Sequence, residues 1–151
     1  MTSAGHPDWL QPDWHAPGVG ALMTTRHGGI SQGPFSGMNI RGGLGDDPAA
    51  VAHNQALLAA AIGARPVYLD QVHGRGVVRL TPDLVGHVPQ ADASVCTEPG
   101  LACTVQVADC LPVLFAAPGA RVVAGAHAGW RGLSADMLKA TVETLCQTTD
   151  C

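Results

Sequence analysis

The sequence predicts an α+β fold, a single domain in which mixed β-sheet layers pack against helices. Short apolar runs of strand length, interrupted by Gly and Pro, fill the middle of the chain. Two longer segments, 46–63 and 134–147, instead space their apolar residues as helices do. The 151 residues are 46% hydrophobic, which suffices for one core. No linker or internal repeat divides the chain, so we expect a single domain. We expect this domain to cover residues 19–151 and residues 1–18 to form an N-terminal arm.

The arm and the segment after it begin the fold. Trp9 and Trp14 are expected to anchor the arm onto a core. Residues 20–26, GALMTTR, predict a strand. Residues 27–37 contain four Gly and one Pro, which predicts a tight loop with a functional role.

The segment 46–63 carries the clearest helix signals in the chain. Asp47 suits the N-cap, Pro48 suits the first helical position, and Gly63 suits the C-terminal stop. Its predicted apolar stripe, spaced by seven and four residues, consists of Val51, Leu58 and Ile62.

The second half of the chain alternates strand-like runs with turns and ends in a second helix. The runs that predict strands are 66–72, 75–80, 91–97, 101–108, 111–116 and 121–127. A turn at His73–Gly74 separates the first two runs, and a Pro-broken loop covers 81–90. The last helix is predicted over 134–147 with Ser134 as its cap.

Composition excludes several classes of function. The net charge of −4 and the absence of a Lys/Arg patch argue against nucleic-acid binding. No apolar stretch reaches the roughly 18 residues of a membrane span, and the N-terminus lacks a signal-peptide pattern. Five cysteines without a CxxC pair fit a reducing compartment, so we expect a cytoplasmic protein.

Three side chains stand beside chain-breaking residues at the ends of apolar runs: His73, Cys110 and His127. If several strand ends converge, two imidazoles and one thiolate would form a three-ligand metal site with a fourth position open, as catalytic zinc has. Two alternatives use the same atoms. The residues can be a core cysteine and two hydrogen-bonded histidines, or Cys110 can be a nucleophile that an imidazole activates.

Other polar residues are candidates for contacts around such a site. Gln71 lies two positions before His73, so in an extended segment it points to the same side and would orient a ligand or substrate. Arg131, in a turn before the last helix, and Arg26, before the Gly-rich loop, are candidates to hold phosphate or carboxylate.

Six motifs in order make the chain resemble the YfiH/YlmD family, which is described both as a multicopper polyphenol oxidoreductase (laccase) domain and as a zinc-dependent purine nucleoside phosphorylase. The motifs are TTRHGGIS, GDDPAAVAHNQ, LDQVHG, QADAS, ADCLPVL and AHAGWRGL. The resemblance implies a YfiH-like fold in which His73, Cys110 and His127 are the metal ligands and the catalytic residues. It also implies substrate contacts from Arg26, Asn39, Gln71 and Arg131. Since family members extend well beyond the GWRG helix, it further implies a chain truncated at its C-terminus.

The resemblance implies an activity and a cofactor. Purine nucleosides (adenosine, inosine, guanosine and methylthioadenosine) would react with phosphate to give the base and ribose 1-phosphate, with adenosine deaminase activity beside this. The implied cofactor is Zn²⁺, with copper as the alternative. Monomer and homodimer both remain open.

Three other functions remain as alternatives. Copper-dependent polyphenol oxidation is one, although seven His without a His-x-His pair would support a single metal only. A metal-free cysteine hydrolase acting on an amide is the second. The third is an inactive truncated remnant, which would bind metal without turnover.

Overall fold

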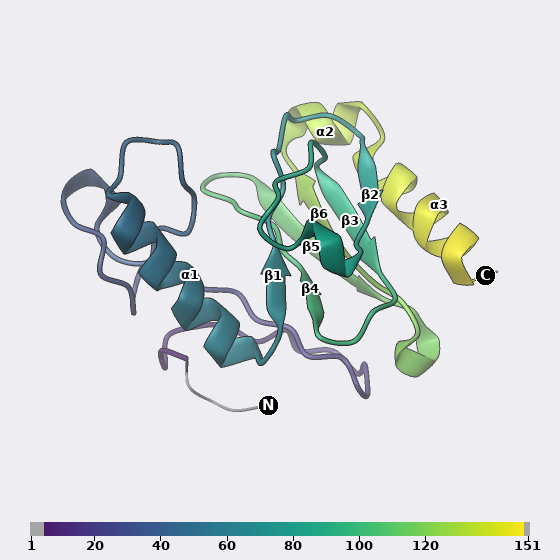
Figure 1. Cartoon of the computed structure of the whole chain (residues 1–151). Coiled ribbons are helices and arrows are strands. Elements are labelled where there is room, and N and C mark those ends of the chain that lie inside the picture. Colours follow the sequence, from purple (N-terminus) through teal and green to yellow (C-terminus); the bar gives the residue numbers. More distant parts are fainter. Residues whose placement is uncertain (1–4, 150–151) are drawn as a thin grey trace. The chain divides into compact units, whose positions relative to one another are not determined.

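The computed structural model describes residues 5–149 and confirms the predicted α+β class (Figure 1). The described chain divides into two compact units, each treated by itself below. The first comprises 5–15 and 20–64, and the second comprises 16–19 and 65–149. No helix within the described residues is long and apolar enough to span a lipid bilayer.

Helix α1, Pro48–Ile62, organises the first unit and confirms the predicted helix. The Asp47 side chain accepts a hydrogen bond from the Ala49 amide at 3.0 Å, as an N-cap does. Gly63 ends the helix in the left-handed region at φ 62°. The buried face of α1 packs into a small core made of Trp9, Met38, Leu58 and Ala61.

The strand predicted at 20–26 is wrong. Only Met23 pairs, through an isolated bridge to Leu10 with two 2.8 Å hydrogen bonds. A strand requires a partner along its length, and here the following loop, 27–37, folds back on the segment instead. The Met38 amide donates to the Arg26 carbonyl, and a Cβ at Gly37 would overlap that same carbonyl. Gly37, at φ 101°, is therefore required for this close approach.

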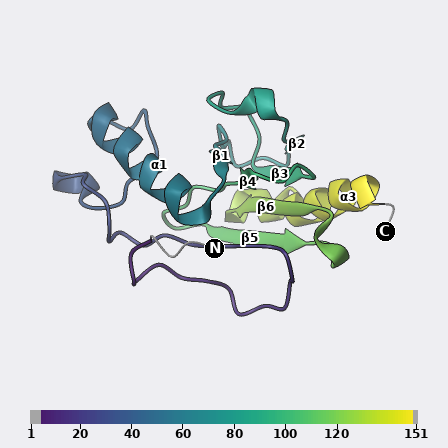
Figure 2. The same cartoon turned by 60° about the horizontal axis from the view of Figure 1, so that its bottom comes forward.

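Two sheets form the framework of the second unit (Figures 1 and 2). The strands are β1 (Arg65–Val67), β2 (Val77–Arg79), β3 (Ala93–Cys96), β4 (Leu101–Cys103), β5 (Leu111–Ala116) and β6 (Val123–Ala128). In the larger sheet β2 pairs with β3 in parallel, and β3 and β5 each pair antiparallel with β6. In the smaller sheet β1 and β4 pair in parallel.

Some strand boundaries differ from the prediction. The run 111–116 is confirmed as β5, whereas in the run 101–108 the strand ends at Cys103. In the run 66–72 the strand ends at Val67, and after it Asp70 pairs through an isolated bridge to Gln90. β1 and β4 pair with each other over three residues. The apolar pattern continues beyond those residues, but a strand ends where its ladder partner ends.

The C-terminal segment contains two helices where one was predicted. Helix α2 spans Trp130–Ser134 and helix α3 spans Met137–Thr149. Ser134 is therefore the last residue of α2 and not a cap, because Asp136 breaks the helix at φ 60°. Helix α3 packs on the larger sheet, with Leu145 against Val95 and Ala124 in one core cluster.

Candidate metal centre

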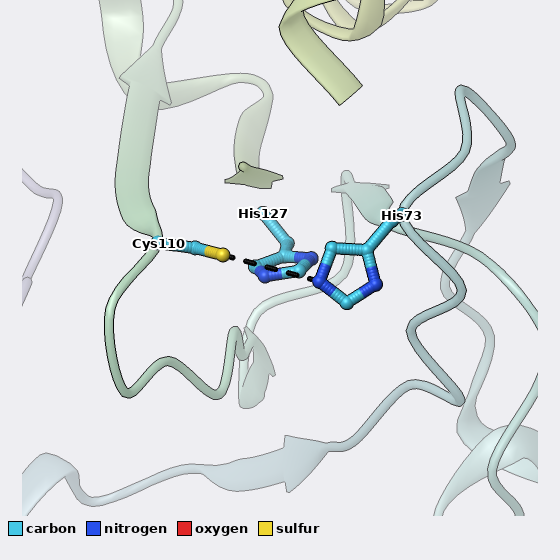
Figure 3. A group of neighbouring side chains, drawn as sticks. All are labelled: His73, Cys110 and His127. Atoms are coloured by element: carbon cyan, nitrogen blue, oxygen red, sulfur yellow. Dashed lines mark hydrogen bonds between the residues drawn. The ribbon is translucent and has the colours of Figure 1, made fainter. Parts of the chain in front are cut away.

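The three predicted ligands meet at one end of the larger sheet (Figure 3). Their ligand atoms all lie within 4.8 Å of one another. His127 is in β6, and Cys110 lies directly before the start of β5, whereas the sequence predicted that it follows the end of a strand. His73 lies in the turn between β1 and β2.

Strand pairing explains why Cys110 and His127 are neighbours. In the antiparallel pair of β5 and β6, Pro112 stands opposite His127 and Leu111 opposite Ala128. The thiol that precedes β5 therefore reaches the residue after β6, Gly129. A Cβ at Gly129 would lie 2.8 Å from Cys110 Sγ and 3.3 Å from His73 Cδ2, so only glycine leaves room for both side chains.

The spacing of the donor atoms suits one metal ion. Cys110 Sγ lies 4.0 Å from His73 Nε2, and the two imidazole centroids are 4.9 Å apart at 68°. A tetrahedral ion with bonds of about 2.3 Å to sulfur and 2.0 Å to nitrogen would hold these atoms roughly 3.6 Å apart. The pair of Cys110 and His73 therefore needs to close by a few tenths of an ångström, and a pair of donor atoms at the 4.8 Å limit by about 1 Å. Two imidazoles and a thiolate are ligands that both zinc and copper accept.

Burial differs across the group. His127 is buried at 4% exposure, Cys110 is half-buried, and His73 is exposed. The donor atoms are thus reached from the solvent on the side of His73. An open coordination position on this side could take water or a substrate atom.

Asp92, for which no role was predicted, supports two of the three candidate ligands. Its carboxylate is fully buried and lies 2.7 Å from His127 Nδ1. It also accepts hydrogen bonds from three consecutive backbone amides, those of Val72, His73 and Gly74, at 2.9–3.1 Å. The sequence signal was an acidic residue within the short strand-like run 91–97.

The environment keeps Asp92 ionised. Burial raises the pKa of its carboxyl, but the hydrogen bonds from His127 and from the three backbone amides lower that pKa more, so the net pKa is below the usual value. At neutral pH the group is a carboxylate, which only accepts hydrogen bonds.

Gln71 is buried and connects two of the ligand-bearing segments. Its amide nitrogen donates to the Gln106 carbonyl at 2.7 Å, and its amide oxygen accepts from the Gln106 backbone N–H at 2.8 Å. These two hydrogen bonds hold the segment that leads to Cys110 beside the segment that leads to His73. A contact between Gln71 and substrate stays a prediction.

Arg131 lies in helix α2, not in the turn that was predicted. It is exposed, and its guanidinium carbon lies 4.9 Å from the centroid of the Trp130 ring, a cation–π contact. Trp130 is itself 73% exposed. Both residues directly follow Gly129, so they belong to the same end of the sheet as the donor group.

Arg26 belongs to the first unit, where it lines an open hollow of about 570 Å³. His6, Asp8 and His27 line the same hollow, and Asp8 Oδ2 lies 2.7 Å from His27 Nδ1. Backbone of the Gly-rich loop completes the wall. Basic side chains beside glycine backbone could hold an oxyanion there.

Asn39, also in the first unit, takes part in a hydrogen-bond network that organises the Gly-rich loop. Its amide donates to Asp46 Oδ2 at 3.0 Å and to the Arg41 carbonyl. Hydrogen bonds from the side chains of Ser31 and Asn39 lower the pKa of Asp46. The same loop depends on Asn54, which the sequence analysis missed.

Asn54 is fully buried on α1. Its amide nitrogen donates to Ser31 Oγ and to the carbonyls of Gly37 and Asn39, while its oxygen accepts from the Ile30 amide. The sequence feature that could have identified Asn54 is its position three residues after Val51 and four before Leu58, where a polar residue lies inside the apolar stripe.

Several known proteins are similar to this chain. A family model described as "Multi-copper polyphenol oxidoreductase laccase" matches residues 20–151. A Pseudomonas aeruginosa protein named purine nucleoside phosphorylase is 51% identical over 138 residues, which cover 91% of this chain and 56% of the relative. The Escherichia coli purine nucleoside phosphorylase YfiH is 45% identical, covering 90% of this chain and 55% of the relative.

Solved structures show the same fold. A Neisseria meningitidis protein aligns with a TM-score of 0.85 at 43% identity and covers 91% of this chain and 57% of its own. YlmD from Geobacillus stearothermophilus aligns with a TM-score of 0.83 at 35% identity and covers 94% of this chain and 57% of its own. The chain thus spans somewhat more than half the length of the relatives it matches.

Proposed function

This chain belongs to the multi-copper polyphenol oxidoreductase laccase family, and from that premise we propose that it serves the phosphorolysis of purine nucleosides at a single zinc ion. His73, Cys110 and His127 would hold the ion. The observation that carries the proposal is the meeting of two imidazoles and one thiol from three separate segments of the second unit. The names of the bacterial relatives support the choice of reaction.

One ion, and not several coppers, suits the donor set. Within residues 5–149, one group of three or more His, Cys, Asp or Glu side chains has its donor atoms placed so that they could hold an ion: His73, Cys110 and His127. A bound divalent ion would supply Lewis acidity at the exposed side of the group. Since zinc and copper both accept these ligands, the choice of zinc follows the family resemblance and needs direct measurement.

The reaction would make one bond and break one. A phosphate oxygen would bond to C1′ of the ribose while the bond from C1′ to the purine nitrogen breaks. The base would leave with the electron pair and take up a proton, giving base and ribose 1-phosphate, or base and 5-methylthioribose 1-phosphate when the substrate is methylthioadenosine. The substrates proposed are adenosine, inosine, guanosine and methylthioadenosine.

The chain's own residues would bind and orient these substrates. Arg26, in its hollow with two histidines, and Arg131, exposed beside Trp130, are the proposed phosphate-binding residues. His73 is exposed, and a nucleoside would reach the donor group from its side. Substrate contacts from Asn39 and Gln71 remain predictions, since both side chains already hydrogen-bond within the protein.

The test is metal analysis of the purified protein combined with chromatography of adenosine incubated with and without phosphate. We expect one zinc per chain and phosphate-dependent release of adenine with ribose 1-phosphate. Inosine formed without phosphate would mean that the reaction is deamination and not phosphorolysis. Copper with intense visible absorption and phenol oxidation would overturn the proposal, as would activity that resists chelators while Cys110 is covalently trapped. Bound zinc without any product would identify an inactive chain.

Variants locate the reaction within the chain. His127→Ala should abolish both zinc binding and product, whereas His53→Ala, at an exposed histidine on α1, should change neither. Arg26→Ala and Arg131→Ala should each be compared for KM towards phosphate. An arginine whose variant leaves the KM for phosphate unchanged would no longer be a proposed phosphate-binding residue.

A further inference from the structure

One carboxylate joins two of the candidate metal ligands. Asp92 Oδ2 contacts both His127 Nδ1 and the His73 amide, while Oδ1 accepts from the amides on either side of His73. The backbone reinforces this arrangement, because the His127 amide donates to the Asp92 carbonyl at 2.7 Å. β3 and β6 thus hold Asp92 and His127 opposite each other at the end of their ladder.

The contact between the Asp92 carboxylate and His127 determines which nitrogen of the His127 ring has a lone pair for a metal ion. A carboxylate only accepts hydrogen bonds, so the 2.7 Å contact assigns the proton of neutral His127 to Nδ1. The lone pair then lies on Nε2, the nitrogen available to a metal ion. With His127 only 4% exposed, solvent has little access to reverse this assignment.

The contact with the His73 turn determines the backbone conformation. His73 adopts the left-handed region at φ 59°, which costs a residue with a side chain roughly 1–2 kcal/mol. Three successive amides that converge on one anion form a nest, and the buried carboxylate fills it. The carboxylate therefore stabilises the turn that directs His73 towards Cys110.

We infer that Asp92 is a positioning residue that pre-forms the metal-binding group by fixing the tautomer of His127 and the turn of His73 together. It acts through these two residues and does not touch substrate. The inference rests on the proposed function for its metal, but the hydrogen bonds that join Asp92 to the two histidines are contacts within the protein itself.

The test uses the full chain and the substitution Asp92→Asn. An asparagine has one oxygen in place of two, so it can satisfy either His127 or the turn but not both. We expect zinc affinity, measured by competition with a chromophoric chelator, to fall about 10–100-fold. We also expect ¹⁵N NMR of the metal-free variant to show loss of the single Nδ1–H tautomer of His127. Circular dichroism reports whether the variant is folded.

Asp109→Asn is the matched control, because Asp109 is exposed and precedes Cys110. It removes the same charge near the group and should leave both measurements unchanged. Wild-type affinity together with an unchanged His127 tautomer in Asp92→Asn would overturn the inference. If Asp92→Asn does not fold, ¹⁵N NMR of the metal-free wild-type protein tests the inference instead. An Nε2–H tautomer of His127 in that protein would overturn the inference. Absence of zinc binding in the wild type would instead contradict the proposed function.

Discussion

At the scale of single residues, two fully buried polar side chains organise the loops that carry the candidate site residues. Asp92 holds the turn of His73 and the ring of His127, and Asn54 holds the Gly-rich loop that follows Arg26. Each makes at least four hydrogen bonds in a buried setting, where an unpaired polar group is costly. Residues of this kind position a site without themselves entering the chemistry.

We predict that Asn54→Asp destabilises the protein by about 3 kcal/mol. A carboxylate cannot donate to the carbonyls of Gly37 and Asn39, and each buried acceptor left without its donor costs about 1–3 kcal/mol. Urea unfolding measures the change in free energy. The control, His53→Asp, introduces the same carboxylate at an exposed neighbouring position and should change stability little. Equal losses in the two variants would contradict the role assigned to Asn54.

At the scale of elements, the pairing of β5 with β6 brings the Cys110 thiol beside Gly129, and Gly129 leaves space for that thiol and for the His73 ring. Gly129 has an ordinary extended backbone at φ −79°, so its importance lies in close packing and not in conformation. The neighbouring Gly132, within α2, has only ordinary contacts of 3.5 Å at the position of a Cβ.

We predict that Gly129→Ala weakens zinc binding by at least about tenfold while leaving the secondary structure intact. The new methyl group would lie 2.8 Å from Cys110 Sγ and would displace the thiol from the group, and loss of even 1.4 kcal/mol is a tenfold change. Zinc affinity by chelator competition tests this. Gly132→Ala adds the same methyl group where there is room and should bind zinc like the wild type. Weakening of the same size in both variants would refute the steric explanation.

At the scale of the whole molecule, the donor group of His73, Cys110 and His127 consists of side chains from three segments that are distant in sequence. His73 and Cys110 alone are 37 positions apart. An ion bound to the folded group but not to the unfolded chain would stabilise the fold by mass action, by about 2.7 kcal/mol when free zinc is a hundredfold above its dissociation constant.

We therefore predict that chelation of the metal lowers the melting temperature by roughly 5–10 °C, given that 1 kcal/mol corresponds to about 2–4 °C in a chain of this size. Differential scanning calorimetry with and without chelator measures the shift. Cys110→Ser, which removes one ligand, should show a much smaller response to the chelator. A chelator effect that persists undiminished in Cys110→Ser would mean that the ion binds elsewhere.

Much of the fold was predictable because its signals are local. The cap at Asp47, the proline at Pro48 and the stop at Gly63 lie within the helix that they delimit, and α1 formed with those limits. The apolar run 111–116 likewise became β5. The positions of His73, Cys110 and His127 beside chain-breaking residues were enough to nominate them as one group, and the structure brings them together.

The sequence by itself therefore determined the α+β class, the main helix of the first unit and the three donor side chains. Only the tertiary structure decided that 20–26 is not a strand, that β4 stops at Cys103 and that Asp92 joins the ligands. Capping and apolar periodicity act between residues a few positions apart, so they can be read along the chain. Ladder pairing and the contact between Asp92 and His127, 35 positions apart, exist only once the chain has folded.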